Sequence, residues 1–128
     1  MLTISPAQME AFTRAERAVF ADRLAAHVRA GFPDEADRLG PAGLRDLVDA
    51  GVVKAAAHGI EIEADVSMYV VLMAGFGPDF ETDPAHPWAR QVLQNPEYAD
   101  PSDKAAYLFE AGLEEARRRD GLGPDDDR

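Results

Sequence analysis

The sequence predicts an all-α fold, a compact single-domain bundle of four to five helices with one long ordered loop at about residues 77–87. Apolar residues recur at steps of three and four along most of the chain, which is the spacing of one helix face. Capping residues, prolines and glycines bound these stretches, and no two strand-like runs are present to pair with each other. A chain of 128 residues is long enough for one domain with its own core.

The first predicted helix spans residues 6–32. Ser5 is a favoured capping residue, Pro6 suits the first helical position, and Gln8 completes a capping box. The ring of Pro33 disfavours a helical conformation at the residue before it, so the helix should end there. We expect its buried face to carry Met9, Phe12, Val19, Phe20, Leu24 and Val28.

The second predicted helix spans residues 41–59. It begins at the proline after Gly40 and ends at Gly59, which suits the left-handed conformation that closes many helices. Gly43 and Gly51 should weaken it, because glycine is a poor helix former. Its buried residues are expected to be Leu44, Leu47, Val48 and Val52.

The third predicted helix spans residues 63–76 and should be the central, most buried one. Its body, residues 66–74, is apolar on almost all sides. Acidic residues near its start suit the positive end of the helix dipole. The run at residues 70–72 could instead form a buried strand, but its flanks have a helical composition and no second such run offers it a partner.

Two further helices are predicted after the long loop. A short one spans residues 87–94 and the last one spans residues 101–119. The inner face of the last helix is expected to carry Ala105, Leu108, Phe109, Leu113 and Ala116. We therefore expect one helical domain over residues 1–119 and a disordered acidic tail over residues 120–128.

Acidic residues outnumber basic ones by 24 to 13, which gives the chain a formal charge of −11. This charge opposes binding to phosphate backbones and anionic membranes, so we expect neither nucleic acid nor a membrane as partner. The absence of cysteine excludes disulfides, thiolate nucleophiles and cysteine-based metal sites. The sequence opens with no signal-peptide pattern and holds no apolar stretch long enough for a bilayer, so we expect a soluble, cytoplasmic protein.

Residues 75–89, GFGPDFETDPAHPWA, are the most distinctive segment, and we call them the signature loop. Asp79, Glu81 and Asp83 alternate like the first three ligands of a calcium loop. The pattern then breaks, because a proline stands where the sharp turn needs glycine and an arginine where the loop needs a bidentate glutamate. We therefore predict no metal here, with Asp79 and Glu81 solvated and Asp83 as a capping residue.

Recognisable catalytic motifs are missing from the sequence. His27, His58 and His86 are far apart and form no helical metal-binding pair. The serines belong to no nucleophile elbow, and no glycine-rich phosphate loop is present. We therefore predict a protein without enzymatic activity and without a cofactor. The alternative is a small metal-dependent hydrolase that uses the acids of residues 79–86 together with His86.

Two aromatic residues of the signature loop, Phe80 and Trp88, are costly to expose to water. Each one either fills the helical core or anchors a partner protein. Because the loop directly follows the most apolar helix, packing in the core is the favoured interpretation.

A wider set of residues includes much of this loop: Gly59, Ile60, Asp65, Val66, Tyr69, Leu72, Met73, Phe76, Gly77, Asp79, Phe80, Asp83, Pro84, Pro87, Trp88 and Ala89. With the opening Leu2, Thr3 and Ile4, this set resembles a family of small, largely uncharacterised helical bacterial proteins encoded beside effectors of the type VI secretion system. The resemblance covers most of the chain, and its strongest motif is the signature loop.

The resemblance implies a non-enzymatic accessory protein, an adaptor or chaperone that binds a type VI secretion effector or a component of its delivery spike. The alternative is an immunity protein whose acidic surface neutralises a cognate toxin. In either case the partner is a protein, and the candidate partner-binding residues are Asp79, Phe80, Glu81, Asp83, His86 and Trp88.

Overall fold

The computed structural model describes residues 14–120. Over these residues the chain forms five α-helices, one short 3-10 helix and no strand: α2 (Arg14–Gly31), α3 (Pro33–Ala57), α4 (Glu63–Phe76), α5 (Pro87–Leu93), η1 (Pro96–Tyr98) and α6 (Pro101–Asp120). The predicted compact all-α domain is confirmed. The predicted helix start at Ser5, Pro6 and Gln8, the apolar Met9 and Phe12, and the predicted tail beyond residue 120 lie outside the described residues.

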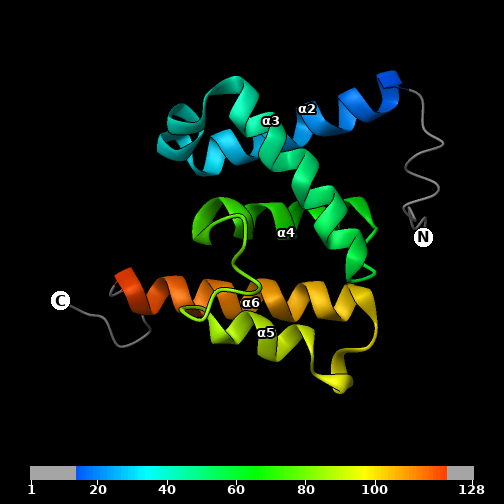
Figure 1. Ribbon diagram of the computed structural model, residues 1–128, viewed down its shortest axis with the longest axis vertical. Coiled ribbons are helices and arrows are strands. Elements are labelled where there is room, and N and C mark those ends of the chain that lie inside the picture. Colours follow the sequence, from blue (N-terminus) through cyan, green and yellow to red (C-terminus); the bar gives the residue numbers. More distant parts are fainter. Residues whose placement is uncertain (1–13, 121–128) are drawn as a thin grey trace.

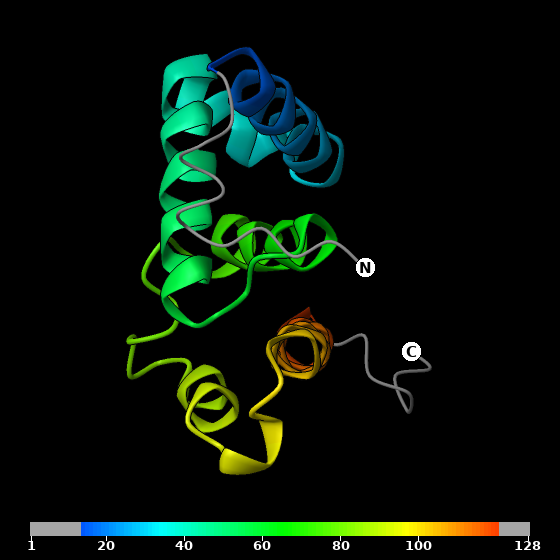
Figure 2. The ribbon, with the colours of Figure 1, turned by 90° about the vertical axis from the view of Figure 1, so that its right-hand side faces the viewer.

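The helices stack in three layers, with α4 in the middle. α2 and α3 cross above α4, and α6 and α5 lie below it, as Figure 1 and Figure 2 show from two directions. α4 packs against α2, α3 and α6. Its buried residues are Val66, Tyr69, Val70, Leu72, Met73 and Ala74. The prediction of a central and most buried third helix is therefore confirmed.

The start of α3 differs from the prediction. The helix begins at Pro33, eight residues before the predicted start, and is kinked at Gly40, whose backbone has φ 75° and ψ 169°. Pro33 ends α2 as predicted, but proline also suits the first position of a new helix, and acidic residues fill the first turn that follows. The buried Ala36 then holds this extra segment against the core.

Two glycines bring neighbouring helices close to α4. A Cβ atom on Gly51 of α3 would lie 2.5 Å from Val70 Cγ2 and 3.1 Å from Met73 Sδ. A Cβ atom on Gly112 of α6 would clash with the side chain of Leu72. Gly51 was expected only to weaken its helix, but the structure shows that its missing side chain allows α3 and α4 to pack closely.

Two residues expected on buried faces are exposed instead. Val19 of α2 is 57% exposed and Leu113 of α6 is 40% exposed. In α2 the core is reached by Phe20, Leu24 and Val28, which follow one another at four-residue steps, and Val19 lies about 100° away from Phe20 around the helix. Each of these outer helices therefore buries a narrower stripe than its apolar residues predict.

Candidate functional site

The signature loop is anchored in the core by its aromatic residues. Phe80 is fully buried, and its ring centroid lies 5.2 Å from that of Tyr69 on α4. Trp88, at the start of α5, stacks on Phe80 at 5.9 Å and meets Phe76 edge-on at 5.0 Å, and it is partly buried against the core. Phe80 therefore closes the core, as the sequence favours, and cannot contact a partner unless the loop opens.

The acidic residues of the loop serve local structure. Lys54 Nζ, from α3, donates to the backbone carbonyl of Pro78 and to Asp79 Oδ1, the latter at 2.6 Å. Asp83 Oδ1 accepts a hydrogen bond from the backbone N–H of Ala85 at 2.9 Å, which closes a side-chain turn. Asp79 thus fixes the start of the loop to α3, and Asp83 shapes its second half.

His86 lies inside the loop with 12% of its side chain exposed. Its Nε2 atom is 3.9 Å from Asp83 Oδ2, its ring meets Phe76 edge-on at 5.2 Å, and its Nδ1 atom is buried without a hydrogen-bond partner. Within residues 14–120 no three His, Cys, Asp or Glu side chains gather closely enough to hold a metal ion. A metal-dependent hydrolase would need His86 close to the acidic residues of the loop. The structure gives His86 only one such contact, the distant one with Asp83.

Glu81 was expected to be solvated, but the structure places its Oε1 atom in the interior, without a hydrogen-bond partner. The hydroxyl of Tyr69 is also buried and also lacks a partner of good geometry. Burial raises the pKa of Tyr69, and the nearby charge of Glu81 raises it further. Burial also lowers the pKa of His58, at the C-terminal end of α3, while the charge of Glu81 acts in the opposite direction. The loop therefore folds its glutamate inward, beside Tyr69 and His58.

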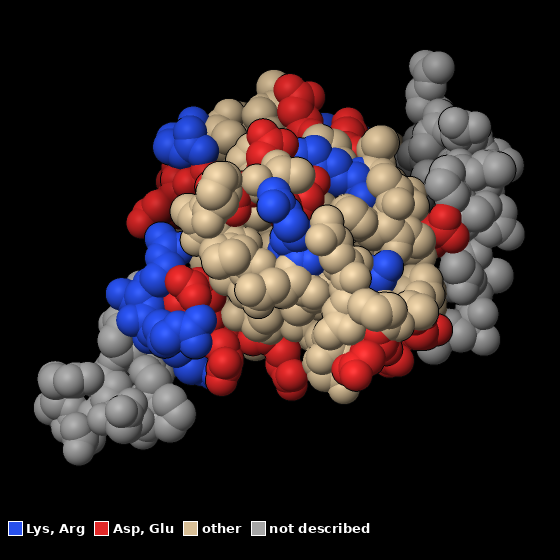
Figure 3. All heavy atoms as spheres, turned by 60° about the horizontal axis from the view of Figure 1, so that its bottom comes forward, with Lys and Arg blue, Asp and Glu red and all other residues tan. Residues whose placement is uncertain are grey.

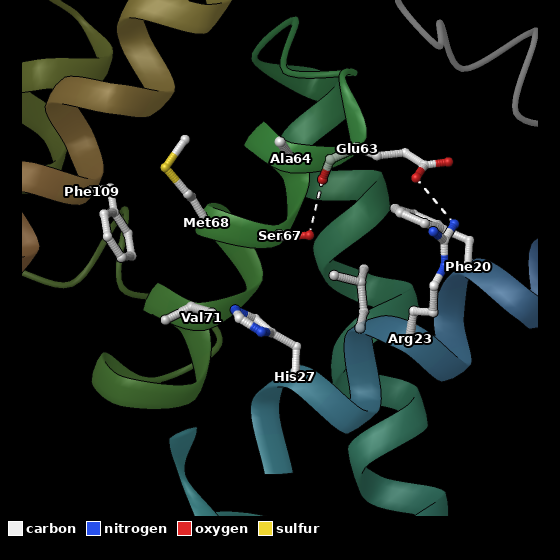
Figure 4. A pocket seen from close by; sticks show the side chains of 10 residues that line it. Phe20, Arg23, His27, Glu63, Ala64, Ser67, Met68, Val71 and Phe109 are labelled. Carbon is white, nitrogen blue, oxygen red and sulfur yellow. Dashed lines mark hydrogen bonds and ion pairs between the residues drawn. The ribbon is translucent and has the colours of Figure 1, made fainter. Parts of the chain in front are cut away.

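A second feature is an apolar groove along the side of α4 that α3 does not cover. It consists of two hollows of about 640 Å³ and about 230 Å³. We call it the α4 groove. Its principal apolar lining is Phe20 and Leu24 of α2, Ala64, Met68, Val71 and Gly75 of α4, and Phe109 and Ala116 of α6. Figure 4 shows the larger hollow, with Phe109 on one side, α2 on the other and α4 between them.

Polar side chains stand at the two ends of the α4 groove. At the start of α4, Arg23 and Glu63 form an ion pair of 3.2 Å, and Figure 4 shows both at the rim. His27, also from α2, lines the same hollow. At the far end the guanidinium of Arg119 lies 5.4 Å from the ring centroid of Phe76. Ser67, whose hydroxyl donates to the backbone carbonyl of Glu63, also lines the floor. The groove is therefore mainly apolar, with Ser67 and His27 along its length and charged residues at its ends, a form that suits protein binding.

None of the groove residues is among the candidate partner-binding residues predicted from the sequence. A signal was nevertheless present, because α4 is apolar on almost all sides but is covered closely by only some of its neighbours. The residues Ala64, Met68, Val71 and Gly75 follow helical spacing and form one stripe. The helix pattern alone does not tell which stripe of α4 stays uncovered, since that depends on how α2 and α6 pack.

Within residues 14–120 no helix combines the length and the apolar character that a membrane span requires. No protein family, curated protein or solved structure matches the chain.

Proposed function

We propose that this protein is a non-enzymatic binding protein that holds an amphipathic helix of a partner protein in the α4 groove. The observation that carries the proposal is the groove itself, an apolar channel between α2 and α6 with polar residues at both ends. Grooves of this form bind the apolar face of a helix through side chains spaced three and four residues apart.

The dimensions of the groove favour a helix of about three turns. Its floor runs along α4 from Ala64 to Gly75, twelve residues whose ends lie about 16 Å apart at the helical rise. Small residues at both ends of this floor let another helix approach closely, while Met68 and Val71 supply apolar contact between them. The formal charge of −11 on the whole chain favours a partner helix that carries basic residues.

We propose further that the partner is a type VI secretion effector or a component of its delivery spike, and that the protein acts in the cytoplasm as an adaptor or chaperone. This rests on the resemblance carried by the signature loop and by residues such as Tyr69. An adaptor of this kind keeps an apolar helix of its client covered until the client is loaded. The groove supplies a surface suited to that role.

The test is co-expression of the full chain with the effector encoded beside its gene. The two proteins should co-purify, and deletion of this gene should lower effector solubility and secretion. Absence of a complex, with solubility and secretion unchanged, would contradict the proposal. Protection of a target cell from the effector, with secretion unaffected by the deletion, would favour the immunity role instead, in which the acidic surface covers a toxin.

A further inference from the structure

A second surface lies on the other side of α6 from the α4 groove. Tyr98 of η1 and Tyr107 of α6 stack with ring centroids 4.2 Å apart and an angle of 19° between the rings. Tyr107 is 45% exposed, although an aromatic ring is costly to leave in water. The two rings border a hollow of about 590 Å³ that Glu110 and Glu114 also line. We call these four residues the tyrosine surface.

The charge around the tyrosine surface is mostly negative. Glu110 and Glu114 lie one and two turns after Tyr107 on the same face of α6, and Asp103 lies one turn before it. Among residues 14–120 the structure gives no ion pair to Asp103 or Glu110, and Glu114 makes only a contact of 3.9 Å with Arg118. Arg117 also lines the hollow, but among residues 14–120 no ion pair joins it to Glu110 or Glu114, and the acidic side chains outnumber it there.

Figure 3 shows the lower part of the molecule, where α5 and α6 lie. An area of mostly uncharged side chains, interrupted by a few basic ones, is bordered by acidic residues along its lower edge in this view. Basic side chains gather at the left side of this view, and the last turn of α6 carries Arg117, Arg118 and Arg119. The charge thus changes sign along α6, from the acids beside the tyrosines to the arginines of its last turn.

We propose that the tyrosine surface binds an arginine-bearing basic segment of a partner protein. A guanidinium can lie flat on the exposed ring of Tyr107 and direct its N–H groups to Glu110 and Glu114. Both contacts favour a cation, and arginine more than lysine, because its planar fork stacks on a ring while donating to carboxylates. An anionic ligand such as a phosphate is repelled by the same carboxylates.

This surface is distinct from the α4 groove and does not depend on it. Phe109 and Ala116 line the groove and Tyr107, Glu110 and Glu114 line the second hollow, while Leu113 lies between them and lines both. A partner could therefore bind both surfaces at once or either one alone. The inference goes beyond the proposed function, because it would hold even if no helix binds in the groove.

The test uses the full chain and two blocked peptides of three arginines or three lysines, with binding followed by NMR chemical shifts. The tri-arginine peptide should shift the signals of Tyr107 and Glu110 in a saturable manner and bind about two- to fivefold more tightly than the tri-lysine peptide. Glu110→Gln and Tyr107→Leu should each raise Kd by a similar factor, whereas Tyr107→Phe should retain binding because the ring remains.

The matched control is Asp46→Asn, which removes one charge from an exposed position on α3 and should leave Kd unchanged. Equal weakening by Asp46→Asn and Glu110→Gln would reduce the effect to net charge and overturn the proposal. The proposal would also be overturned if both peptides bound equally well and Tyr107→Leu had no effect. An absence of saturable chemical-shift changes would overturn it as well. A change at Val71 in the groove should leave peptide binding as it is.

Discussion

Val71 of α4 and Phe109 of α6 line both hollows of the α4 groove. These two side chains therefore join the hollows into one surface that extends from Ala64 to Gly75 along α4. Both are only partly buried within residues 14–120. An apolar channel of this length with polar ends is a form that monomeric proteins seldom expose without a use.

The groove can be probed without a partner. Ala64 is exposed on its floor, so Ala64→Gln should leave the fold intact and obstruct one end of the channel. We expect this variant to bind less of the apolar dye ANS than the unaltered chain. Ala106→Gln, at an exposed position of α6, is the matched control and should bind ANS as before. Equal dye binding by all three proteins would mean that the dye does not report the groove.

Close packing of α3 on α4 predicts that Gly51→Ala is destabilising. The new Cβ would lie 2.5 Å from Val70 Cγ2, and a β-branched side chain in a helix has little freedom to move away. We expect a loss of about 1–3 kcal/mol in the free energy of unfolding, measured with urea. Gly31→Ala, where nothing lies within 4 Å of the added atom, should cause no such loss. An equally stable Gly51→Ala variant would contradict the packing.

Phe80 should contribute far more to the stability of the protein than the exposed ion pair between Lys54 and Asp79. Phe80→Ala removes a fully buried ring and should cost about 3–5 kcal/mol. Asp79→Asn weakens a pair in which the carboxylate is 79% exposed and should cost at most about 1 kcal/mol. Thermal unfolding of both variants checks this order. A larger loss of stability in Asp79→Asn than in Phe80→Ala would show that the contact with Lys54, and not the buried ring of Phe80, holds the loop.

The buried hydroxyl of Tyr69 predicts an alkaline loss of stability. Its pKa is raised in the folded state from the ordinary value of 10.0, so above about pH 10 the unfolded chain releases a proton that the folded chain retains. The free energy of unfolding should therefore fall as the pH rises, by up to about 1.4 kcal/mol per pH unit from this group. Tyr69→Phe should lose this part of the dependence in urea titrations from about pH 9 to about pH 11. If the unfolding free energy of the unaltered chain and of Tyr69→Phe fell equally with pH, the prediction would be contradicted.

The local rules of helix formation predict much of this fold. The bounds of α4 match because acidic residues begin it and Gly77, with φ 109°, follows its end. The helical segment after Pro33 is missed, because proline can mark either the end of one helix or the start of the next. The prediction placed too many residues on the buried face of α2, since Val19 belongs to the apolar pattern but is 57% exposed.

The site is less predictable than the fold, because it depends on contacts between distant segments. The core position of Phe80 follows from the sequence. The prediction that Asp83 caps a helix was wrong, because α5 begins after His86 without a side-chain cap, and Asp83 instead closes a turn with Ala85. The inward position of Glu81 does not, because nothing local indicates that the loop turns its carboxylate towards Tyr69. The α4 groove cannot be predicted from the sequence either, because its walls come from α2 and α6, which are distant from each other in the chain.

The most direct test of the α4 groove is the Kd between the full chain and the secretion effector that we propose as its partner, measured by isothermal titration calorimetry. Val71→Asp places a charge in the groove, and Val53→Asp places the same charge on α3, where the valine is 70% exposed. Thermal unfolding should first show that both variants are folded, and Ala64→Gln serves as a second groove variant.

We predict that Val71→Asp raises Kd on the order of tenfold or more, whereas Val53→Asp leaves it unchanged. The same Kd for all three proteins, or equal weakening by the two aspartates, would contradict helix binding in the α4 groove.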